Sequence, residues 1–382
     1  MKIVYVYDSI ARIGGTERIL TDKMNYLAET YGHEVYLITS SQGNHPLSFP
    51  LSDKVKHIDL DTKFHLQYQH PFLKQLRMGW SLDHKFEQRL KKEITRINPD
   101  IISGNTSFKA DLICRLDCKA KKVIESHCAK TYTRIPENRK KSFFKDVKDR
   151  YVSCQCFREI KRYSDAIVTL TQEDATMWGK DPNIHVIPNT TSIIDTHTSS
   201  PCEAPRVIAA GRLTWQKGFD RLIDAWDIVQ KRHPGWMLDI FGEGFYKDFL
   251  TKQVKDRKLE HSITIHPFTQ NITQEYLNSS IMALSSNYEG FGLVLIEAMS
   301  LGVPCVSFDC PFGPSEIIRD QEDGLLVKNG DIQGFANAIC HLIEHEAERK
   351  AFGKSAKENV KRYSPQNIMP QWEMLFHKLT EK

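Results

Sequence analysis

Residues 288–304 have the sequence YEGFGLVLIEAMSLGVP, in which two glycines precede an apolar run. Glycine adopts tight turns with positive φ that other residues avoid, so Gly290 and Gly292 predict a loop. The apolar residues 293–299 predict a helix that begins at this loop. Because a strand is predicted to follow from Pro304, the segment indicates an α/β fold.

Glu289 is expected in this loop, and Glu297 on the helix. The unpaired N–H groups of a first helical turn and the positive end of the helix dipole bind anions such as phosphate. One carboxylate at the mouth of such a site and one inside it indicate a polyhydroxylated, phosphorylated ligand. Glutamates at this spacing also occur on solvated helix faces, but the Gly-Phe-Gly between them favours binding. We therefore predict a ligand site formed by Glu289, Gly290, Phe291, Gly292, Leu293 and Glu297.

The length of 382 residues exceeds one ordinary core and fits two domains of under about 200 residues each. In both halves, short apolar runs alternate with helical patterns, which predicts parallel sheets covered by helices. One such helix, near 219–231, has an apolar face formed by Phe219, Leu222, Ile223, Trp226 and Val229. Residues 190–205, rich in Ser, Thr and Pro, predict an interdomain linker.

The segment 288–304 resembles the E-x7-E signature of the retaining glycosyltransferases of family 4 (glycosyltransferase group 1), which have the GT-B fold. Further matches extend along almost the whole chain. The resemblance implies two Rossmann-like domains with parallel sheets facing each other across a cleft. Residues 1–195 would form the acceptor-side domain and residues 196–363 the nucleotide-sugar-binding domain. Residues 364–382 would form a C-terminal helix that returns to the N-terminal domain, whereas their spacing alone predicts only an amphipathic helix.

Two basic residues, Arg212 and Lys217, lie between a predicted strand and a predicted helix, where open α/β sheets bind ligands. A forked guanidinium and a point-charge ammonium together suit a diphosphate. Basic residues are also ordinary in surface loops. In the family, the matching Arg and Lys hold the phosphates of the donor and assist departure of the nucleotide, which assigns Arg212 and Lys217 to both binding and catalysis.

Gly14 and Gly15 follow the first predicted strand and open the first helix, so their amides can approach a phosphate or a sugar. They also suit a simple tight turn; the family places its donor-facing glycine loop here. His127 follows a predicted strand, and a single histidine is more often structural than catalytic. The resemblance places it at the active-site histidine that lies against the donor sugar.

Two other patterns suggest different chemistry. Asp59 and Asp61 match the D-x-D of metal-dependent glycosyltransferases, but the positive charge of Arg212 and Lys217 makes a metal role unfavoured. Gly242 and Gly244 follow a predicted strand as in a dinucleotide loop, but Lys247 stands where the third glycine is needed. We therefore predict no metal and no cofactor.

The composition indicates a cytoplasmic protein. Nine cysteines without paired spacing favour a reducing compartment, and no apolar stretch is long enough for a signal peptide or a membrane span. Residues 1–195 hold 31 Lys and Arg against 24 acidic residues, and the remainder holds 21 against 24. The basic and aromatic residues 139–151 suit either a solvated helix or an interfacial helix on anionic lipid at the inner membrane face. No nucleic-acid partner is predicted.

The combined prediction is a retaining transferase that moves a hexose, with UDP favoured over GDP, to a glycan or lipid-linked acceptor in cell-surface polysaccharide synthesis. Glu289 would hold sugar hydroxyls, Glu297 the ribose hydroxyls and His127 the developing charge, while the diphosphate leaves by front-side displacement. Two alternatives are a UDP-sugar epimerase of the same fold and a catalytically silent nucleotide-sugar-binding member of an assembly complex.

Overall fold

The computed structural model describes residues 1–11, 14–131, 143–191, 193 and 198–381. The chain divides into two compact units: Met1–Ile187 together with Met369–Lys382, and Pro188–Ile368. The division after Ile187 precedes the boundary at residue 195 that the sequence suggested. The last helix, α13 (Pro365–Thr380), contributes all but its first residues to the first unit.

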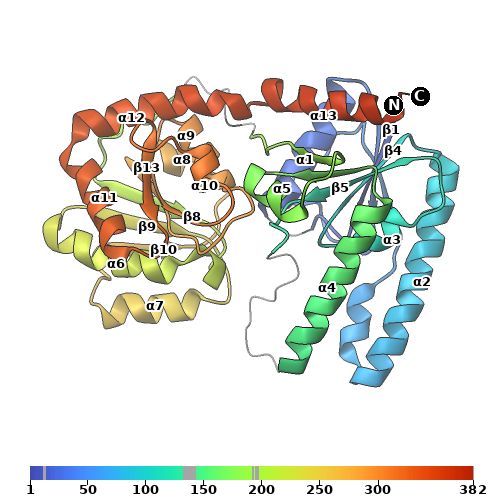
Figure 1. The fold of residues 1–382 in the computed structure, drawn as a ribbon. Helices are drawn as coiled ribbons and strands as arrows, with labels where there is room; N and C mark the ends of the chain where they lie inside the picture. Colours follow the sequence, from blue (N-terminus) through green and yellow to red (C-terminus); the bar gives the residue numbers. More distant parts are fainter. Residues whose placement is uncertain (12–13, 132–142, 192, 194–197, 382) are drawn as a thin grey trace. The chain divides into compact units, whose positions relative to one another are not determined.

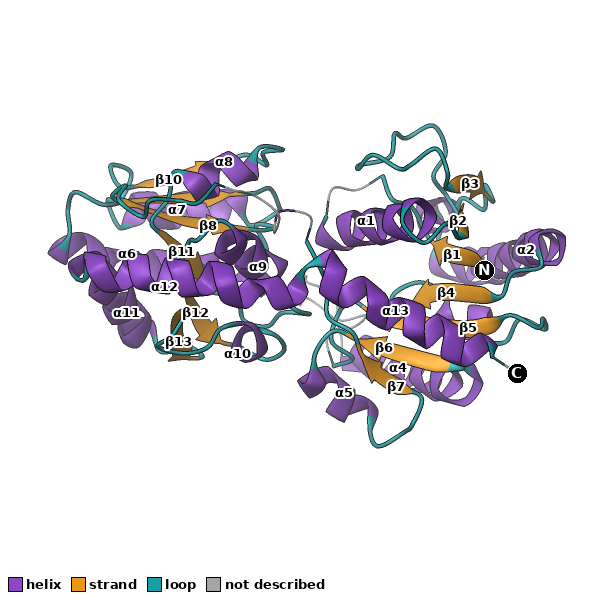
Figure 2. Cartoon of the chain, turned by 90° about the horizontal axis from the view of Figure 1, so that it is seen from above, coloured by secondary structure: helices purple, strands orange, loops and turns teal. Residues whose placement is uncertain are grey.

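The first unit contains a parallel sheet with the strand order β3-β2-β1-β4-β5-β6-β7 (Figures 1 and 2). Its strands are β1 (Lys2–Tyr7), β2 (Glu34–Thr39), β3 (Lys56–Asp59), β4 (Ile101–Asn105), β5 (Lys121–Ser126), β6 (Ala166–Thr169) and β7 (Ile184–Val186). Its other helices are α1 (Gly15–Glu29), η1 (Phe64–Gln69), α2 (Phe72–Ile97), α3 (Ala110–Cys114), α4 (Phe143–Tyr163) and α5 (Gln172–Trp178).

The second unit contains a parallel sheet with the order β10-β9-β8-β11-β12-β13. Its strands are β8 (Arg206–Ala210), β9 (Met237–Phe241), β10 (Ile263–His266), β11 (Ile281–Leu284), β12 (Cys305–Asp309) and β13 (Gly324–Lys328). Its helices are η3 (Trp215–Lys217), α6 (Phe219–Arg232), α7 (Lys247–Asp256), α8 (Ile272–Leu277), α9 (Leu293–Ser300), α10 (Pro314–Ile317), α11 (Ile332–Glu344), α12 (Glu346–Asn359) and η4 (Val360–Tyr363). The prediction of two Rossmann-like domains with parallel sheets is confirmed.

Alternation along β1 explains how helices cover both faces of the first sheet. Val4 and Val6 belong to the buried cluster that includes Phe86 of α2 and Ile160 of α4. Tyr5 points to the opposite face, where the Lys23 ammonium of α1 lies 5.2 Å from its ring centroid. Successive side chains of a strand point to opposite faces, so one strand serves both layers. The predicted apolar face of α6 is confirmed, because all five of its residues are buried in the core of the second unit.

In each sheet, the chain first adds strands on one side of a starting strand and then returns to add strands on its other side. In the first unit, β1 lies between β2 and β4, and in the second, β8 lies between β9 and β11. Ligands of open α/β sheets bind beyond the carboxyl ends of the strands at such a switch point. The switch points lie between β1 and β4 and between β8 and β11, so ligands are expected at the loops that follow these strands. The loop after β5 leaves the sheet from the same edge, next to β4.

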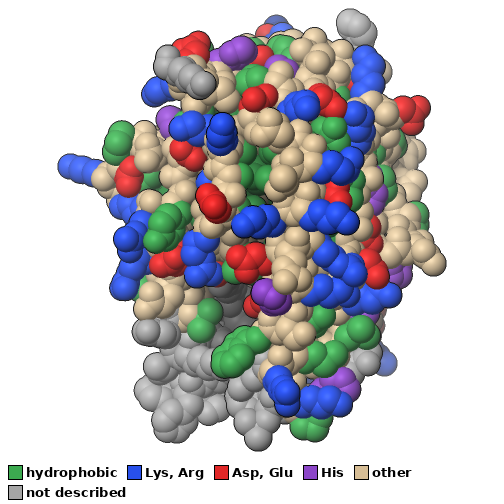
Figure 3. Space-filling view, turned by 90° about the vertical axis from the view of Figure 1, so that its right-hand side faces the viewer, with side chains coloured by type: hydrophobic (Ala, Val, Ile, Leu, Met, Phe, Trp, Pro, Cys, Tyr) green, Lys and Arg blue, Asp and Glu red, His purple; other side chains and the backbone are tan. Residues whose placement is uncertain are grey.

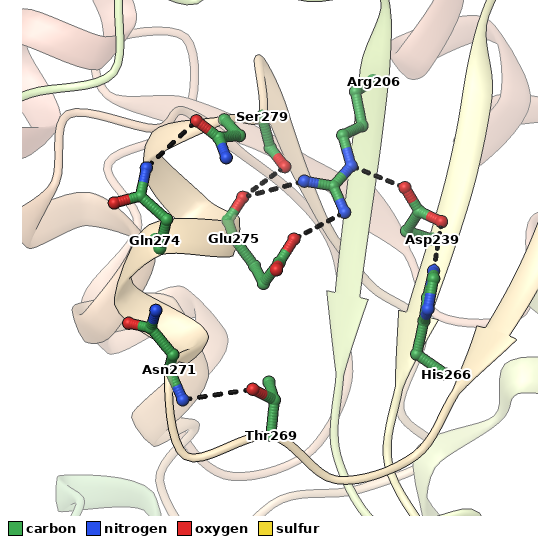
Figure 4. A network of polar contacts seen from close by, with 9 residues as sticks. Arg206, Asp239, His266, Thr269, Asn271, Gln274, Glu275 and Ser279 are labelled. Carbon is green, nitrogen blue, oxygen red and sulfur yellow. Dashed lines mark hydrogen bonds and ion pairs between the residues drawn. The ribbon is translucent and has the colours of Figure 1, made fainter.

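An ion network holds the second sheet to a helix (Figure 4). The Arg206 guanidinium, at the start of β8, contacts the Asp239 carboxylate of β9 at 2.5 Å and the Glu275 carboxylate of α8 at 2.7 Å. His266, at the end of β10, contacts the other oxygen of Asp239 at 2.5 Å. Because each partner comes from a different element, the network fixes β8, β9, β10 and α8 relative to one another.

The surface of the first unit seen in Figure 3 carries basic side chains over most of its extent, with acidic side chains among them. Of the basic-aromatic stretch 139–151, residues 139–142 lie outside the described residues, and the helix α4 begins at Phe143. Within the described part of the chain, no helix is both long enough and apolar enough to cross a bilayer.

Candidate functional site

The loop after β11 brings Glu289 against Lys217. The Lys217 Nζ donates to the Glu289 Oε1 at 2.7 Å, and the Ser286 hydroxyl donates to the same oxygen at 2.5 Å. The lysine side chain is 14% exposed and the glutamate side chain 6% exposed. The pair is therefore shielded on most sides but open to a ligand on the lysine side. Sequence reasoning identified both charges as ligand contacts but did not foresee that they would bind each other.

Backbone contacts tie the loop of Lys217 to the loop of Glu289. The Asn287 amide donates to the Gln216 carbonyl at 2.7 Å, and its side chain donates to the Trp215 carbonyl at 2.6 Å. The Gln216 side chain in turn donates to the Tyr288 carbonyl at 3.2 Å. Sequence reasoning missed Asn287 and Gln216, because their role depends on which backbone carbonyls the fold places opposite them.

Arg212 lies in the same loop as Lys217 but is exposed. Its Nη2 is 3.4 Å from the Gln216 Oε1, a weak contact that leaves the guanidinium at the surface. The turn itself is held by a close approach, since a Cβ on Gly242 would lie 1.9 Å from the Gly211 carbonyl oxygen. Gly242 therefore supports the Arg212 loop from the neighbouring strand end.

The glycine-rich loop before α9 agrees with the sequence except at one position. Gly292, with φ 103°, precedes the helix at Leu293. Gly290 is absent from the positive-φ residues of the described chain, so the prediction of a positive-φ turn there is wrong. Gly313 is the second residue that must be glycine, because it has φ 122° and a Cβ on it would lie 1.8 Å from the Phe291 carbonyl oxygen. This close packing of Gly313 against Phe291 fixes the loop that precedes α9. The sequence did not reveal it.

The remaining residues of this segment differ in exposure. Phe291 is buried, with its ring 5.4 Å from that of Tyr363 in an edge-to-face contact. Its side chain therefore serves the core, and only its backbone can face a ligand. Leu293 and Glu297 are half-buried on α9, with Glu297 one turn further into the helix.

The first unit contributes Gly14, Gly15 and His127. Gly14 precedes α1 in an extended conformation, with φ −161° and ψ 163°, and Gly15 is exposed as its first residue. A Cβ on Gly14 would lie 2.4 Å from a carboxylate oxygen of Glu17, so the glycine leaves room for that side chain. The glycines therefore mark a helix start, as predicted, and residues 12–13 before them lie outside the described residues.

His127 follows β5 and contacts a buried carboxylate. Its Nε2 lies 2.9 Å from the Glu125 Oε2, within ion-pair distance, although the N–H does not point at the oxygen well enough for a hydrogen bond. Its Nδ1 is buried and has no hydrogen-bond partner among the residues that the structure describes. A buried polar atom without a partner favours a site that a ligand completes.

Glu125 is charged in a fully buried position. Burial raises the pKa of Glu125, but Lys23 and His127 outweigh this effect and hold it at about 2. The Lys23 Nζ donates to the Oε2 at 2.5 Å, and the Ser103 hydroxyl donates to the Oε1 at 2.7 Å. Sequence reasoning missed both Lys23 and Glu125, although a lysine on the apolar side of α1 is the signal that could have indicated them.

The two aspartates of the D-x-D pattern already contact other groups of the protein. The Asp59 carboxylate, at the end of β3, accepts from the amides of Gly43 at 2.8 Å and Gln42 at 3.2 Å. Burial raises the pKa of Asp59, but these hydrogen bonds outweigh it and lower the pKa below its ordinary value. Asp61 forms an ion pair with Lys63 at 3.2 Å.

The described residues contain one group of side chains with ligand atoms close enough to share a metal ion. His341, His345 and Glu348 bring these atoms within 4.8 Å of one another where α11 meets α12. His341 and Glu348 already pair at 2.7 Å. All nine cysteines are free thiols, as the composition predicts.

Comparison with known proteins identifies the family. The family described as "Glycosyl transferases group 1" matches residues 194–359. The chain is 30% identical to the amylovoran biosynthesis glycosyltransferase AmsD of Erwinia amylovora, over 97% of this chain and 98% of that protein. It is 27% identical to the lipopolysaccharide 1,6-galactosyltransferase of Escherichia coli K12, over 91% of this chain and 90% of that protein.

A solved structure supports the fold. The crystal structure of HepE from Anabaena in complex with UDP-glucose superimposes with a TM-score of 0.75 at 20% identity, covering 99% of this chain and all of that one. Likeness over both units, with a parallel sheet in each, is the GT-B architecture that the sequence predicted. The chain belongs to the group 1 glycosyltransferases.

Proposed function

We propose that this glycosyltransferase moves a hexose from a UDP-sugar to a glycan or lipid-linked acceptor in the synthesis of a cell-surface polysaccharide, with retention of configuration. The names of the full-length relatives, an amylovoran enzyme and a lipopolysaccharide enzyme, support the class of product. The UDP-glucose bound to HepE supports the choice of donor. The observation that carries the proposal is the Lys217–Glu289 pair at the loop that opens α9.

The pair suits a ligand with a diphosphate next to a sugar. The amides at the start of α9 and its dipole attract an anion, and Lys217 supplies a full positive charge beside them. An ammonium has three donors, so Lys217 can bind a phosphate oxygen while it keeps Glu289. Glu289, which accepts through its oxygens, then offers its second oxygen to a sugar hydroxyl. Arg212 is exposed in the same loop, where its guanidinium would bind the outer phosphate.

The proposed reaction is a front-side displacement. The bond between the anomeric carbon and the diphosphate oxygen breaks, and the acceptor hydroxyl forms the new bond on the same face while its proton passes to the departing phosphate. Lys217 and Arg212 stabilise the growing negative charge of the diphosphate, and Glu289 and His127 stabilise the positive charge on the sugar. Glu297, half-buried on α9, would accept from the ribose hydroxyls. With two cations in this role, the reaction needs no divalent metal.

The test is transfer from a panel of UDP-, GDP- and ADP-hexoses to lipid-linked and oligosaccharide acceptors, with the anomeric configuration of the product determined by NMR. We expect turnover with a UDP-hexose and an α-linked product from an α-linked donor. An inverted product would refute retention. A donor that changes its own sugar without an acceptor would indicate an epimerase, and tight UDP binding without transfer to any acceptor would indicate a silent member.

A lipid-linked acceptor would bring the enzyme to an anionic membrane surface. The basic residues of the stretch 139–151 motivate this part of the proposal. Each basic residue near such a surface contributes about 1 kcal/mol of attraction. Co-sedimentation with vesicles should then require anionic lipid and weaken with salt, and equal recovery on neutral vesicles would contradict it.

A further inference from the structure

We propose that Lys23 and Glu125 are a positioning pair for His127: the lysine neutralises the buried carboxylate so that the histidine stays uncharged and presents the Nδ1 lone pair to the substrate. The inference rests on the proposed function only for the identity of that substrate. Nothing in the proposed chemistry requires Lys23, which lies within α1 and contacts no loop of the site directly.

The contacts define the geometry of the pair. The Glu125 Oε2 lies 2.5 Å from the Lys23 Nζ and 2.9 Å from the His127 Nε2, so one oxygen serves both bases. The other oxygen accepts from Ser103 at 2.7 Å. The side chains of Lys23 and Glu125 are each 3% exposed, and that of His127 is 6% exposed. Water is therefore excluded from all three.

The C-terminal helix covers the Lys23 ammonium. The Trp372 ring of α13 lies over the Lys23 ammonium, with 3.8 Å between the Nζ and the ring centroid. The Tyr5 ring of β1 lies 5.2 Å away on another side. An ammonium held between aromatic faces and a carboxylate is stabilised in its charged form despite burial. Burial lowers the pKa of Lys23 below its ordinary value, and the Glu125 carboxylate at 2.5 Å opposes this without reversing it.

Charge balance then decides the state of the histidine. Lys23 and Glu125 together carry no net charge, so a cationic His127 would add an uncompensated buried charge. A neutral imidazole next to an acceptor carries its proton on the nitrogen that faces that acceptor. This places the proton on Nε2, toward Glu125, and leaves the lone pair on Nδ1, which is buried and, like Nε2, makes no hydrogen bond in the described chain.

The lone pair on Nδ1 suits a hydroxyl-bearing ligand, since a sugar hydroxyl can donate to it. A second buried group without a partner lies just after β4: the Thr106 amide donates to the Glu125 carbonyl at 3.0 Å, and the Thr106 hydroxyl makes no hydrogen bond to any described residue. The arrangement follows the general scheme in which a third group orients a base.

Other titratable groups around the three residues do not replace Lys23. Tyr5 and Tyr7 of β1 are neutral, since burial first and Glu125 second raise their pKa values well above the ordinary range. The charge of Glu17 of α1 also raises the pKa of Tyr7, as the smallest of its causes. Asp174 of α5 accepts a hydrogen bond from the Ser126 hydroxyl at 2.8 Å. Both of these are acids, so Lys23 is the cation that opposes Glu125.

The prediction is a change in the charge state of His127 without Lys23. In Lys23→Met the bare carboxylate attracts a proton to the imidazole, so Nδ1 carries a hydrogen in place of its lone pair. Because Nδ1 then donates and no longer accepts, transfer at neutral pH falls by up to about tenfold, the contribution of one lost hydrogen bond. In a His127→Ala background, Lys23→Met should change the rate by less than about twofold, since coupled residues are non-additive.

The experiment is NMR of 15N-histidine-labelled enzyme without substrate, with His127 assigned from His127→Ala. The wild-type ring should be the Nε2–H tautomer at neutral pH and the Lys23→Met ring an imidazolium. Lys56→Met is the matched control, because Lys56 pairs with Glu34 at 2.7 Å on the surface. Lys23→Arg keeps the charge and should restore the wild-type tautomer, which keeps the test valid if Lys23→Met does not fold. A cationic His127 in the wild type, or the wild-type Nε2–H tautomer in a folded Lys23→Met protein, would overturn the proposal. Failure to transfer any sugar would refute the proposed function and leave the NMR result unaffected.

Discussion

Each unit of this enzyme contains a lysine bound to a buried glutamate, yet the two pairs differ in access. Lys217–Glu289 and Lys23–Glu125 have similar distances, 2.7 and 2.5 Å, and each glutamate also accepts from a serine hydroxyl. The Lys217 side chain is 14% exposed, whereas that of Lys23 is 3% exposed. We call Lys217–Glu289 the openable pair, because its lysine is partly exposed, and Lys23–Glu125 the sealed pair, because both of its side chains are buried.

The elements that supply the lysines explain the difference. Lys217 ends the short turn η3 in a loop, so its ammonium can move toward a ligand anion. Lys23 lies within α1 and is covered by Trp372 of α13. A lysine that must exchange partners during a reaction needs a loop position, as Lys217 has. A lysine that fixes a neighbouring residue needs a covered position in a helix, as Lys23 has. Four predictions test this distinction.

The largest effect is expected on stability from Glu125→Ala. The substitution leaves the Lys23 charge buried without its partner, which costs about 3–5 kcal/mol of unfolding free energy. Glu289→Ala leaves a lysine that can turn to water and should cost about 1 kcal/mol. Urea denaturation of both variants measures the difference. Equal losses would show that the two pairs do not differ in burial as described.

The next effect concerns the rate. Lys217→Ala removes the cation proposed to face the leaving diphosphate and should lower kcat by about 10²- to 10³-fold, as removal of one preorganised donor does. Because the substitution also leaves the buried Glu289 carboxylate without its cation, a loss of stability is expected as well, and kcat is measured at a temperature where the variant remains folded. The control is Lys231→Ala on α6, where the lysine side chain is 71% exposed, and it should retain full activity. Wild-type turnover in Lys217→Ala would remove Lys217 from the chemistry.

A smaller effect separates the two glutamates of the openable site. A hydrogen bond to a charged group contributes about 1.5–3 kcal/mol, so Glu297→Ala should weaken UDP about ten- to a hundredfold. Glu289→Ala should keep UDP affinity within a few fold and mainly lower transfer, because its contact is with the sugar. Calorimetry with UDP and initial rates with the full donor distinguish them. The assignment is falsified if Glu289→Ala abolishes UDP binding in a folded protein while Glu297→Ala binds normally.

The openable site was predictable from the sequence, because glycines, charges and helix starts are local signals. Lys217, Glu289, Gly292 and the start of α9 all follow from such signals, whereas the conformation of Gly290 was wrong and the contact between Lys217 and Glu289 was not foreseen. The sealed site was not predictable. The sequence placed His127 at a strand end. His127 contacts Glu125, but the lysine that binds Glu125 is Lys23, which lies 102 positions away in the sequence. Trp372 comes from the end of the chain, and no local pattern joins these three segments.

The smallest effect is expected from removal of divalent metal. If Lys217 and Arg212 neutralise the diphosphate, EDTA should change the rate by less than about twofold, since side-chain cations supply the charge that a metal ion otherwise supplies. Asp59 is the residue that a metal-dependent mechanism would need, and its two oxygens already accept from the amides of Gln42 and Gly43. To bind a metal it would have to release those amides. Initial rates with and without EDTA, and then with added Mn²⁺ or Mg²⁺, measure the effect, and Asp59→Asn should retain turnover within a few fold. Strong inhibition by EDTA that Mn²⁺ or Mg²⁺ reverses would mean that Lys217 does not neutralise the leaving group by itself, and the openable pair would then act on the sugar alone.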